Sequence, residues 1–192
     1  MLRIIHLEEI QNLLLHTPRF VRMLDKKDAD TVPEVKAWLV KIEEALQNNR
    51  MTTVSLIAGL RGALISAEKG VLLDSNIRIH GRFTTRKIKE AVAAEVIKRV
   101  GEVVMETIQG DNARVAQAEE ICQQLIALAK AKRLTMFPQN GMSHTEWLKA
   151  LWSTLSSEQD IAAGTANIEG LVGSSDSLII LDRTLTKNVL SN

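Results

Sequence analysis

Residues 85–132 read TRKIKEAVAAEVIKRVGEVVMETIQGDNARVAQAEEICQQLIALAKAK, and their apolar pattern indicates the fold class of the whole chain. Apolar side chains recur at steps of three and four residues over 85–109 and again over 113–132, which places them on one face of a helix. The residues between these segments, 110–112, are Gly-Asp-Asn, which is typical of a turn. The sequence therefore predicts two long helices, 85–109 and 113–132, joined as an antiparallel hairpin.

The segments before this predicted hairpin are also helical in pattern. Residues 33–48 carry a regular apolar stripe, and we expect this helix and a second one over 51–69 to pack against the hairpin. Nearer the N-terminus, a helical pattern over 7–25 contains Pro18, which lacks a backbone N–H and predicts a break or kink.

The predicted helix over 51–69 is unusual because small residues recur along one of its faces. An interior glycine costs a helix about 1 kcal/mol relative to alanine, so two of them require a compensating gain. The favoured interpretation is close packing of two helices, and the alternative is a backbone surface that a ligand touches. The small residues are Ser55, Ala58, Gly59, Gly62, Ala63 and Ser66.

Between residues 69 and 85 the helical period is lost. Apolar residues at 71–73 are followed by Asp-Ser-Asn at 74–76 and then by alternating apolar and polar residues at 77–80. This order predicts a small β-hairpin near residues 71–80.

The last third of the chain combines a helix signal with a Gly- and Ser-rich segment. Ser143 and Glu146 have the spacing of a capping box, which predicts a helix from there to Leu155. Residues 164–177 are rich in Gly and Ser, so 164–192 is expected to be a flexible or peripheral tail. With no long linker elsewhere, residues 1–192 are expected to form a single helical domain.

The fold class that follows is mostly α: a multi-helix bundle built on the antiparallel hairpin, with the small β-hairpin added. Composition agrees, because 45% of residues are hydrophobic, 24% are charged and only 3% are aromatic. No run approaches the roughly 20 apolar residues that cross a bilayer, so no membrane partner is expected. The single cysteine fits a reducing compartment, which favours a cytoplasmic location.

The sequence contains no recognisable catalytic, cofactor or metal motif. One cysteine and four scattered histidines provide none of the usual metal-ligand spacings, so no metal or cofactor is expected. Cys122 lies on an apolar helical face, where cysteine is usually inert. His144 is explained by the helix start that it occupies. No catalytic residue is therefore predicted; the balance favours a non-enzyme, although an unrecognised helical site is left open.

Charge is distributed unevenly along the chain. Residues 51–100 carry nine basic and four acidic side chains, a net charge of +5, whereas residues 101–192 carry seven and eleven, a net charge of −4. Part of the basic excess lies close to the start of the predicted helix at 85, where free backbone amides also attract anions. These candidate contact residues are Arg78, His80, Arg82, Arg86, Lys87 and Lys89.

Two functions remain as hypotheses. The preferred one is a non-enzymatic cytoplasmic helical interaction or adaptor protein that forms homo-oligomers or binds a protein partner, with the basic stretch 78–89 as its contact surface. The alternative is a regulator that binds nucleic acid through the same stretch. The neutral overall charge of +1 weighs against the second.

Overall fold

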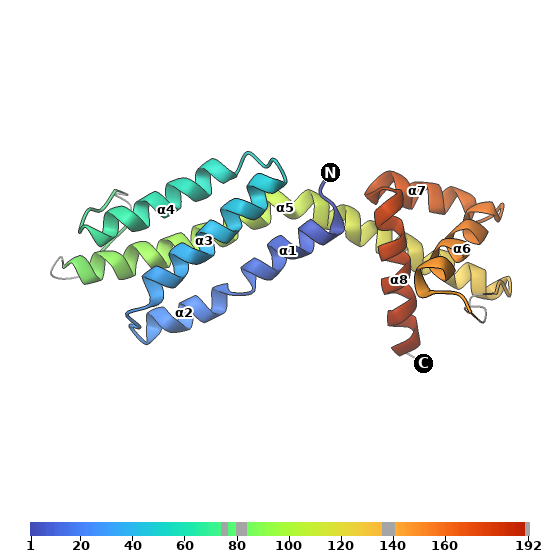
Figure 1. Cartoon of the computed structure of the whole chain (residues 1–192), viewed down its shortest axis with the longest axis horizontal. Helices are drawn as coiled ribbons and strands as arrows, with labels where there is room; N and C mark the ends of the chain where they lie inside the picture. Colours follow the sequence, from blue (N-terminus) through green and yellow to red (C-terminus); the bar gives the residue numbers. More distant parts are fainter. Residues whose placement is uncertain (74–76, 80–83, 136–140, 191–192) are drawn as a thin grey trace. The chain divides into compact units, whose positions relative to one another are not determined.

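The structure, a computed structural model, describes residues 1–73, 77–79, 84–135 and 141–190 (Figure 1). No strand occurs in these ranges, and the prediction of a mostly helical fold is confirmed. In chain order the helices are α1 (Ile4–Leu14), α2 (Thr17–Asp25), α3 (Thr31–Asn48), α4 (Val54–Glu68), α5 (Thr85–Ala131), α6 (His144–Ser157), α7 (Ala162–Val172) and α8 (Ser174–Leu190).

The helices are grouped into two compact units. The N-terminal unit is Ile5–Gln109, and the C-terminal unit combines Met1–Ile4 with Gly110–Asn192. The long helix α5 contributes residues to both units. The sequence prediction of a single domain over residues 1–192 stays a prediction.

The predicted break at Pro18 is confirmed in the N-terminal unit. Helix α1 ends at Leu14 and α2 begins at Thr17, because Pro18 has no N–H to continue the helical hydrogen bonds. The break is stabilised from α3, where Nε1 of Trp38 donates a 2.7 Å hydrogen bond to the carbonyl oxygen of Leu13.

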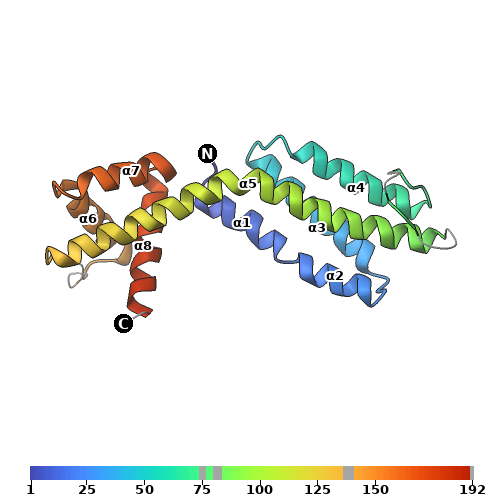
Figure 2. The same ribbon diagram turned by 180° about the vertical axis from the view of Figure 1, so that it is seen from behind.

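In the N-terminal unit, α3 and the first half of α5 lie between α4 on one edge and α1 and α2 on the other (Figures 1 and 2). Two ion pairs join α3 to α4: Lys36 Nζ lies 2.7 Å from Glu68 Oε2, and Arg61 Nε lies 2.6 Å from Glu43 Oε1. The second pair raises the pKa of Arg61 through its hydrogen bond to Glu43. The core between the helices is aliphatic and includes Val35, Leu39, Ile42, Leu46, Ile57, Leu64, Val92, Val96, Val100, Val104 and Ile108.

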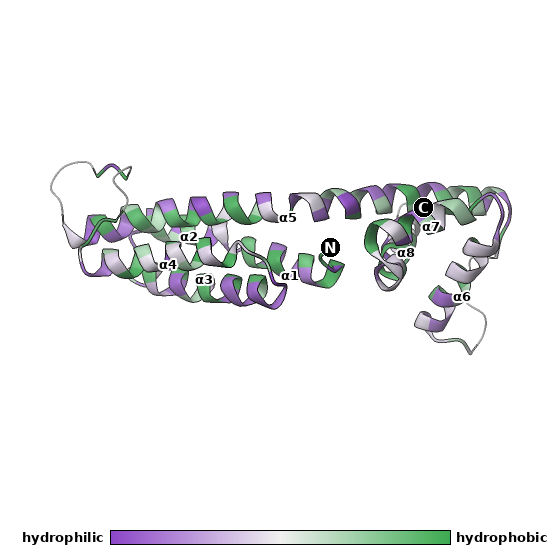
Figure 3. Cartoon of the chain, turned by 90° about the horizontal axis from the view of Figure 1, so that it is seen from above, coloured by the Kyte–Doolittle hydropathy of each residue, from purple (hydrophilic) through white to green (hydrophobic). Residues whose placement is uncertain are grey.

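The predicted antiparallel hairpin of 85–109 and 113–132 is wrong, because α5 is one continuous helix from Thr85 to Ala131. The apolar stripe keeps its phase through residues 110–112: Ile108 is buried, Val115 is half-buried and Ala118 is buried, at steps of seven and three. Figure 3 shows hydrophilic and hydrophobic residues alternating along this helix. The local turn preference of Gly-Asp-Asn was therefore outweighed by burial of a continuous stripe.

The predicted β-hairpin near 71–80 is not seen in the described part of that segment. Residues 71–73 and 77–79 are not in strand conformation, while 74–76 and 80 lie outside the described residues. A two-stranded hairpin alone is marginal in water. Here Leu73 and Ile77 instead line a groove together with residues of α4 and α5.

The C-terminal unit begins, as predicted, with a capped helix. Ser143 accepts a hydrogen bond from the Glu146 backbone N–H, and the Glu146 carboxylate accepts one from Ser143 N at 2.9 Å. The Ser143 hydroxyl also donates a 2.6 Å hydrogen bond to the Glu146 carboxylate, and this bond, followed by the one from the Ser143 backbone N–H, lowers the pKa of Glu146. The capping box therefore fixes the start of α6.

Residues 164–192, expected to be a flexible or peripheral tail, instead supply most of α7 and all of α8. Ile168, Val172, Ile180 and Leu181 are buried in the core of the C-terminal unit. Gly164 faces the side chain of Leu125 so closely that a Cβ there would lie 2.5 Å from it. Gly164 thus permits close packing of α7 against Leu125. The Gly- and Ser-rich composition of the segment did not distinguish this role from flexibility.

Candidate functional site

The predicted basic contact stretch is only partly within the described residues. Arg78 is exposed, and Arg86 and Lys87 are exposed in the first turn of α5, with Lys89 half-buried beside them. His80 and Arg82 lie outside the described residues. The structure thus places two exposed cations, Arg86 and Lys87, in the first turn of α5, and leaves Arg78 exposed in the segment before it.

Acidic groups offset part of this basic charge. Arg86 Nε lies 2.8 Å from Glu90 Oε1, one turn further along α5. Arg86 and Lys89 also line an open cavity of about 350 Å³ together with Lys27, Asp28 and Glu90, so both signs of charge meet there. A surface of mixed charge attracts a phosphate backbone less strongly than a purely basic one.

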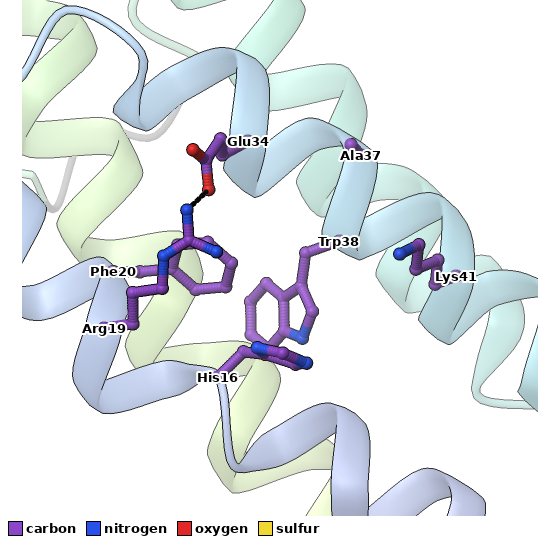
Figure 4. A pocket seen from close by; sticks show the side chains of 7 residues that line it. All are labelled: His16, Arg19, Phe20, Glu34, Ala37, Trp38 and Lys41. Carbon is purple, nitrogen blue, oxygen red and sulfur yellow. Dashed lines mark ion pairs between the residues drawn. The ribbon is translucent and has the colours of Figure 1, made fainter.

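A small pocket between α2 and α3 combines aromatic and charged side chains (Figure 4). The ring centroids of Phe20 and Trp38 lie 5.1 Å apart at its base, and Arg19 Nη2 lies 2.5 Å from Glu34 Oε2 across it. Its volume is about 150 Å³, below the range of about 300–1,000 Å³ typical of ligand sites. Trp38 has a structural role, because its indole N–H donates a hydrogen bond to the Leu13 carbonyl oxygen. The pocket is too small for a typical ligand site.

A larger groove lies on the N-terminal unit between α4 and the first half of α5. It has a volume of about 470 Å³, and most of the side chains lining it are apolar. Among the described residues that line it, two are charged, Glu95 and Arg99, both on α5. The lining residues are Ser55, Leu56, Gly59, Leu60, Ala63, Leu73, Ile77, Val92, Glu95, Val96, Arg99 and Val103.

Large apolar side chains are left exposed along this α4–α5 groove. Leu56 is 59% exposed and Leu73 is 64% exposed. Contact between such apolar side chains and water is unfavourable. Helix α4 carries apolar residues on all sides and only two charged ones, Arg61 and Glu68. Both of those charges pair with α3, so the side of α4 along the groove has no charged residue of its own. A helix that is apolar all round is normally covered on every side.

The glycines of α4 make no close contact with another helix in the part of the chain that the structure describes. A Cβ added at Gly59 or Gly62 would meet no atom within 4 Å. At these two glycines the described residues of the chain therefore make no close helix–helix contact of the kind that the favoured interpretation expects. The alternative, a backbone surface that another molecule approaches, agrees with this geometry.

The groove was missed by the sequence analysis, although one signal for it was present. The 15 residues of α4 include only two charged side chains, which is too few for a helix with one face in water. The residues of α5 that line the groove did not indicate it, because Val92, Val96 and Val103 belong to an ordinary amphipathic stripe.

Cys122 is the one cysteine, and it is buried in the C-terminal unit. Burial raises the pKa of its thiol from 9.0 to about 11, with a smaller opposing effect of a hydrogen bond with Thr184. In the part of the chain that the structure describes, no three His, Cys, Asp or Glu side chains gather as metal ligands.

The burial of Cys122 predicts a stability that depends on alkaline pH. The unfolded thiol ionises near pH 9 and the folded one near 11, so stability is complete below 9 and lost as the pH rises to 11. The loss is on the order of 3 kcal/mol, since each pKa unit is worth about 1.4 kcal/mol. Denaturation of the native protein and of Cys122→Ala across this range measures it: the difference between the two free energies of unfolding should shrink with pH. Parallel pH profiles would contradict the prediction.

Within the described ranges, every helix is too short or too polar to span a bilayer. Comparison with known proteins identifies no relative: no protein-family model, no curated protein and no solved structure matches this chain.

Proposed function

We propose that this protein is a non-enzymatic helical interaction protein, a cytoplasmic adaptor that associates with copies of itself. The observation that supports the proposal is the α4–α5 groove, an apolar surface with exposed Leu56 and Leu73 on one side of the N-terminal unit. Contiguous exposed apolar surface of this kind marks protein interaction sites. Helices commonly meet through such faces, with apolar side chains at steps of three and four as anchors.

The energetic argument is that covering the groove removes apolar surface from water. Burial stabilises an interface by about 25 cal/mol for each Å² of apolar surface, before the entropy of association is subtracted. Small side chains along α4 add little steric bulk, so a partner helix can approach its backbone closely. An association in the micromolar range is the expected result.

Sedimentation velocity over a series of protein concentrations tests this proposal. We expect the weight-average mass to rise above the 21.3 kDa of one chain as concentration increases through the micromolar range. A variant with Leu56→Glu should stay monomeric, and Val40→Glu, at an exposed apolar position of α3 outside the groove, provides the matched control. A native protein that sediments as a monomer throughout would overturn the proposal.

A second candidate, nucleic-acid binding, is favoured by the exposure of Arg86 and Lys87 in the first turn of α5 and of Arg78 in the segment before it. Fluorescence anisotropy of labelled DNA and RNA across a salt series tests it, because contacts to phosphates weaken steeply with salt. The test variant replaces Arg78, Arg82, Arg86 and Lys87 with alanine. The control replaces four basic residues elsewhere on the N-terminal unit, Arg22, Lys26, Lys41 and Arg50, and so removes the same charge. Binding lost only in the first variant would support this candidate, and no binding at low salt would exclude it.

A further inference from the structure

We propose that a cavity in the C-terminal unit binds a small monocarboxylate whose apolar body is about the size of an aromatic ring. Residues that follow α5 line this cavity together with residues of α6 (Figure 1). The α4–α5 groove belongs to the N-terminal unit, so the inference goes beyond the proposed self-association.

The cavity offers apolar surface of both aliphatic and aromatic kind. Its volume is about 400 Å³, within the range of about 300–1,000 Å³ typical of ligand sites. Leu151 on α6 is only 3% exposed, and Leu134 and Trp147 are half-buried beside it. The ring centroid of Trp147 lies 5.3 Å from that of His144, a contact that limits how the indole can turn. An aromatic or branched apolar body can pack against these side chains.

The charge of the cavity is positive and has no counterpart in its lining. Arg133 is the one charged residue among the described residues that line it, and its guanidinium makes no ion pair within the described ranges. Residues 136–140, outside those ranges, read Met-Phe-Pro-Gln-Asn and contain no carboxylate. The three cavities described above differ in this respect, because each has an acidic residue in its lining.

The end of α5 determines where Arg133 and Leu134 leave the helix. The backbone N–H of Leu134 donates a 3.0 Å hydrogen bond to the carbonyl oxygen of Ala129, and that of Arg133 donates one of 3.0 Å to Lys130. This pair of bonds is a Schellman motif, in which glycine is preferred at the position that Arg133 occupies with a φ of 58°. The turn itself therefore gains nothing from an arginine side chain.

A carboxylate matches Arg133 better than a phosphate does. The planar guanidinium offers two parallel N–H groups to the two oxygens of a carboxylate, and one cation balances one negative charge. A phosphate dianion would keep unbalanced charge beside apolar walls, which is costly. The hydroxyl of Thr135 lines the same cavity and can donate a further hydrogen bond to the ligand.

Both parts of the ligand are needed for a good fit. A neutral apolar molecule would cover Arg133 without offering an acceptor for its N–H groups. A bare anion such as acetate would leave the apolar side chains of Leu134 and Trp147 in contact with water. Phenylacetate combines a carboxylate with one aromatic ring and is therefore the probe for this site.

The tryptophans provide a readout that is specific to the cavity. Titration of the full chain with phenylacetate, followed by NMR of the indole N–H groups, should shift the Trp147 signal with a Kd on the order of 1 mM or below. The indole of Trp38 is hydrogen-bonded to Leu13 in the N-terminal unit, and that of Trp152 to Glu169, so both signals should move little. Replacing each tryptophan in turn with phenylalanine assigns the signals.

Substitution of Arg133 tests the role of its charge. Arg133→Gln should bind phenylacetate at least about tenfold more weakly, because the charge-assisted hydrogen bonds are lost. Lys130→Gln is the matched control: it removes the same charge at an exposed position in the last turn of α5, outside the described lining, and should bind as the native protein does. Arg133→Gly should bind as weakly as Arg133→Gln while unfolding at no lower urea concentration than the native protein, since glycine suits this φ.

The neutral isostere phenylacetamide decides whether the cavity selects an anion. It should bind the native protein at least about tenfold more weakly than phenylacetate and should not distinguish the native protein from Arg133→Gln. Equal binding of the acid and the amide, or equal loss in Lys130→Gln and Arg133→Gln, would overturn the proposal. A Trp147 signal that does not move at about ten times the expected Kd would overturn it as well. Self-association is tested separately by sedimentation and stands or falls independently of these results.

Discussion

Replacing Asp176 with alanine is expected to lower the free energy of unfolding of the C-terminal unit by about 3 kcal/mol. Asp176 lies in the first turn of α8 and is only 1% exposed. Its Oδ2 accepts a 2.7 Å hydrogen bond from the backbone N–H of Ile4, and its Oδ1 accepts hydrogen bonds from Nε and Nη2 of Arg3. Alanine would leave the buried Ile4 N–H without this acceptor.

The two contacts of Asp176 are expected to contribute unequally. The Arg3 side chain is 52% exposed, so its ion pair is screened by water and contributes at most about 1 kcal/mol. The carboxylate also lies at the N-terminal end of α8, where the helix dipole favours negative charge. Arg3→Ala should therefore cost much less than Asp176→Ala, and Asp176→Asn, which keeps an acceptor oxygen, should fall between them.

Hydrogen exchange measured by mass spectrometry gives the readout for this prediction. Peptides of α8 and of residues 1–4 should lose protection in Asp176→Ala, and urea denaturation should give the change in free energy. Asp182→Ala is the control on the same helix, because Asp182 pairs with the exposed His144 and should change stability little. Equal effects of Asp176→Ala and Asp182→Ala would contradict the assigned role.

The contact between Asp176 and the N-terminal residues could not be predicted from the sequence. The partners are separated by 172 and 173 positions, and each alone is an ordinary charged or apolar residue. By contrast, the Pro18 break and the Ser143 capping box were predicted correctly, because both depend on residues within one turn. Gly173, with a φ of 87°, ends α7 directly before α8. A glycine at this position marks the end of one helix, and an acidic residue three positions later marks the start of the next. The interpretation of the segment as a Gly- and Ser-rich tail overlooked this signal.

The candidate site shows the same division between local and non-local information. The small residues of α4 and its lack of charge are visible in the sequence, and they indicated a close approach by some backbone. Which backbone approaches depends on the placement of α4 beside α5. The basic stretch 78–89 was visible as a run of charge, but the pairing of Arg86 with Glu90 and the mixed cavity around Lys89 required the structure.

Gly110→Pro is expected to destabilise the protein by at least about 3 kcal/mol and to reduce its helix content. Gly110 lies near the middle of α5, and its φ is not positive as a turn glycine's often is. Proline there removes one hydrogen bond of the helix and clashes with the carbonyl of Glu106 four residues earlier. If residues 110–112 formed the turn of a hairpin, proline would be tolerated.

Gly110→Ala provides the matched test with the opposite sign. A Cβ at this position would meet no atom within 4 Å, so alanine should raise the free energy of unfolding by about 1 kcal/mol through its helix propensity. Circular dichroism and urea denaturation measure both variants under the same conditions. Destabilisation by proline together with stabilisation by alanine requires a helical Gly110. In a turn that needed the conformational freedom of glycine, alanine would lower the free energy of unfolding. The reverse pattern would show that α5 is interrupted at this point.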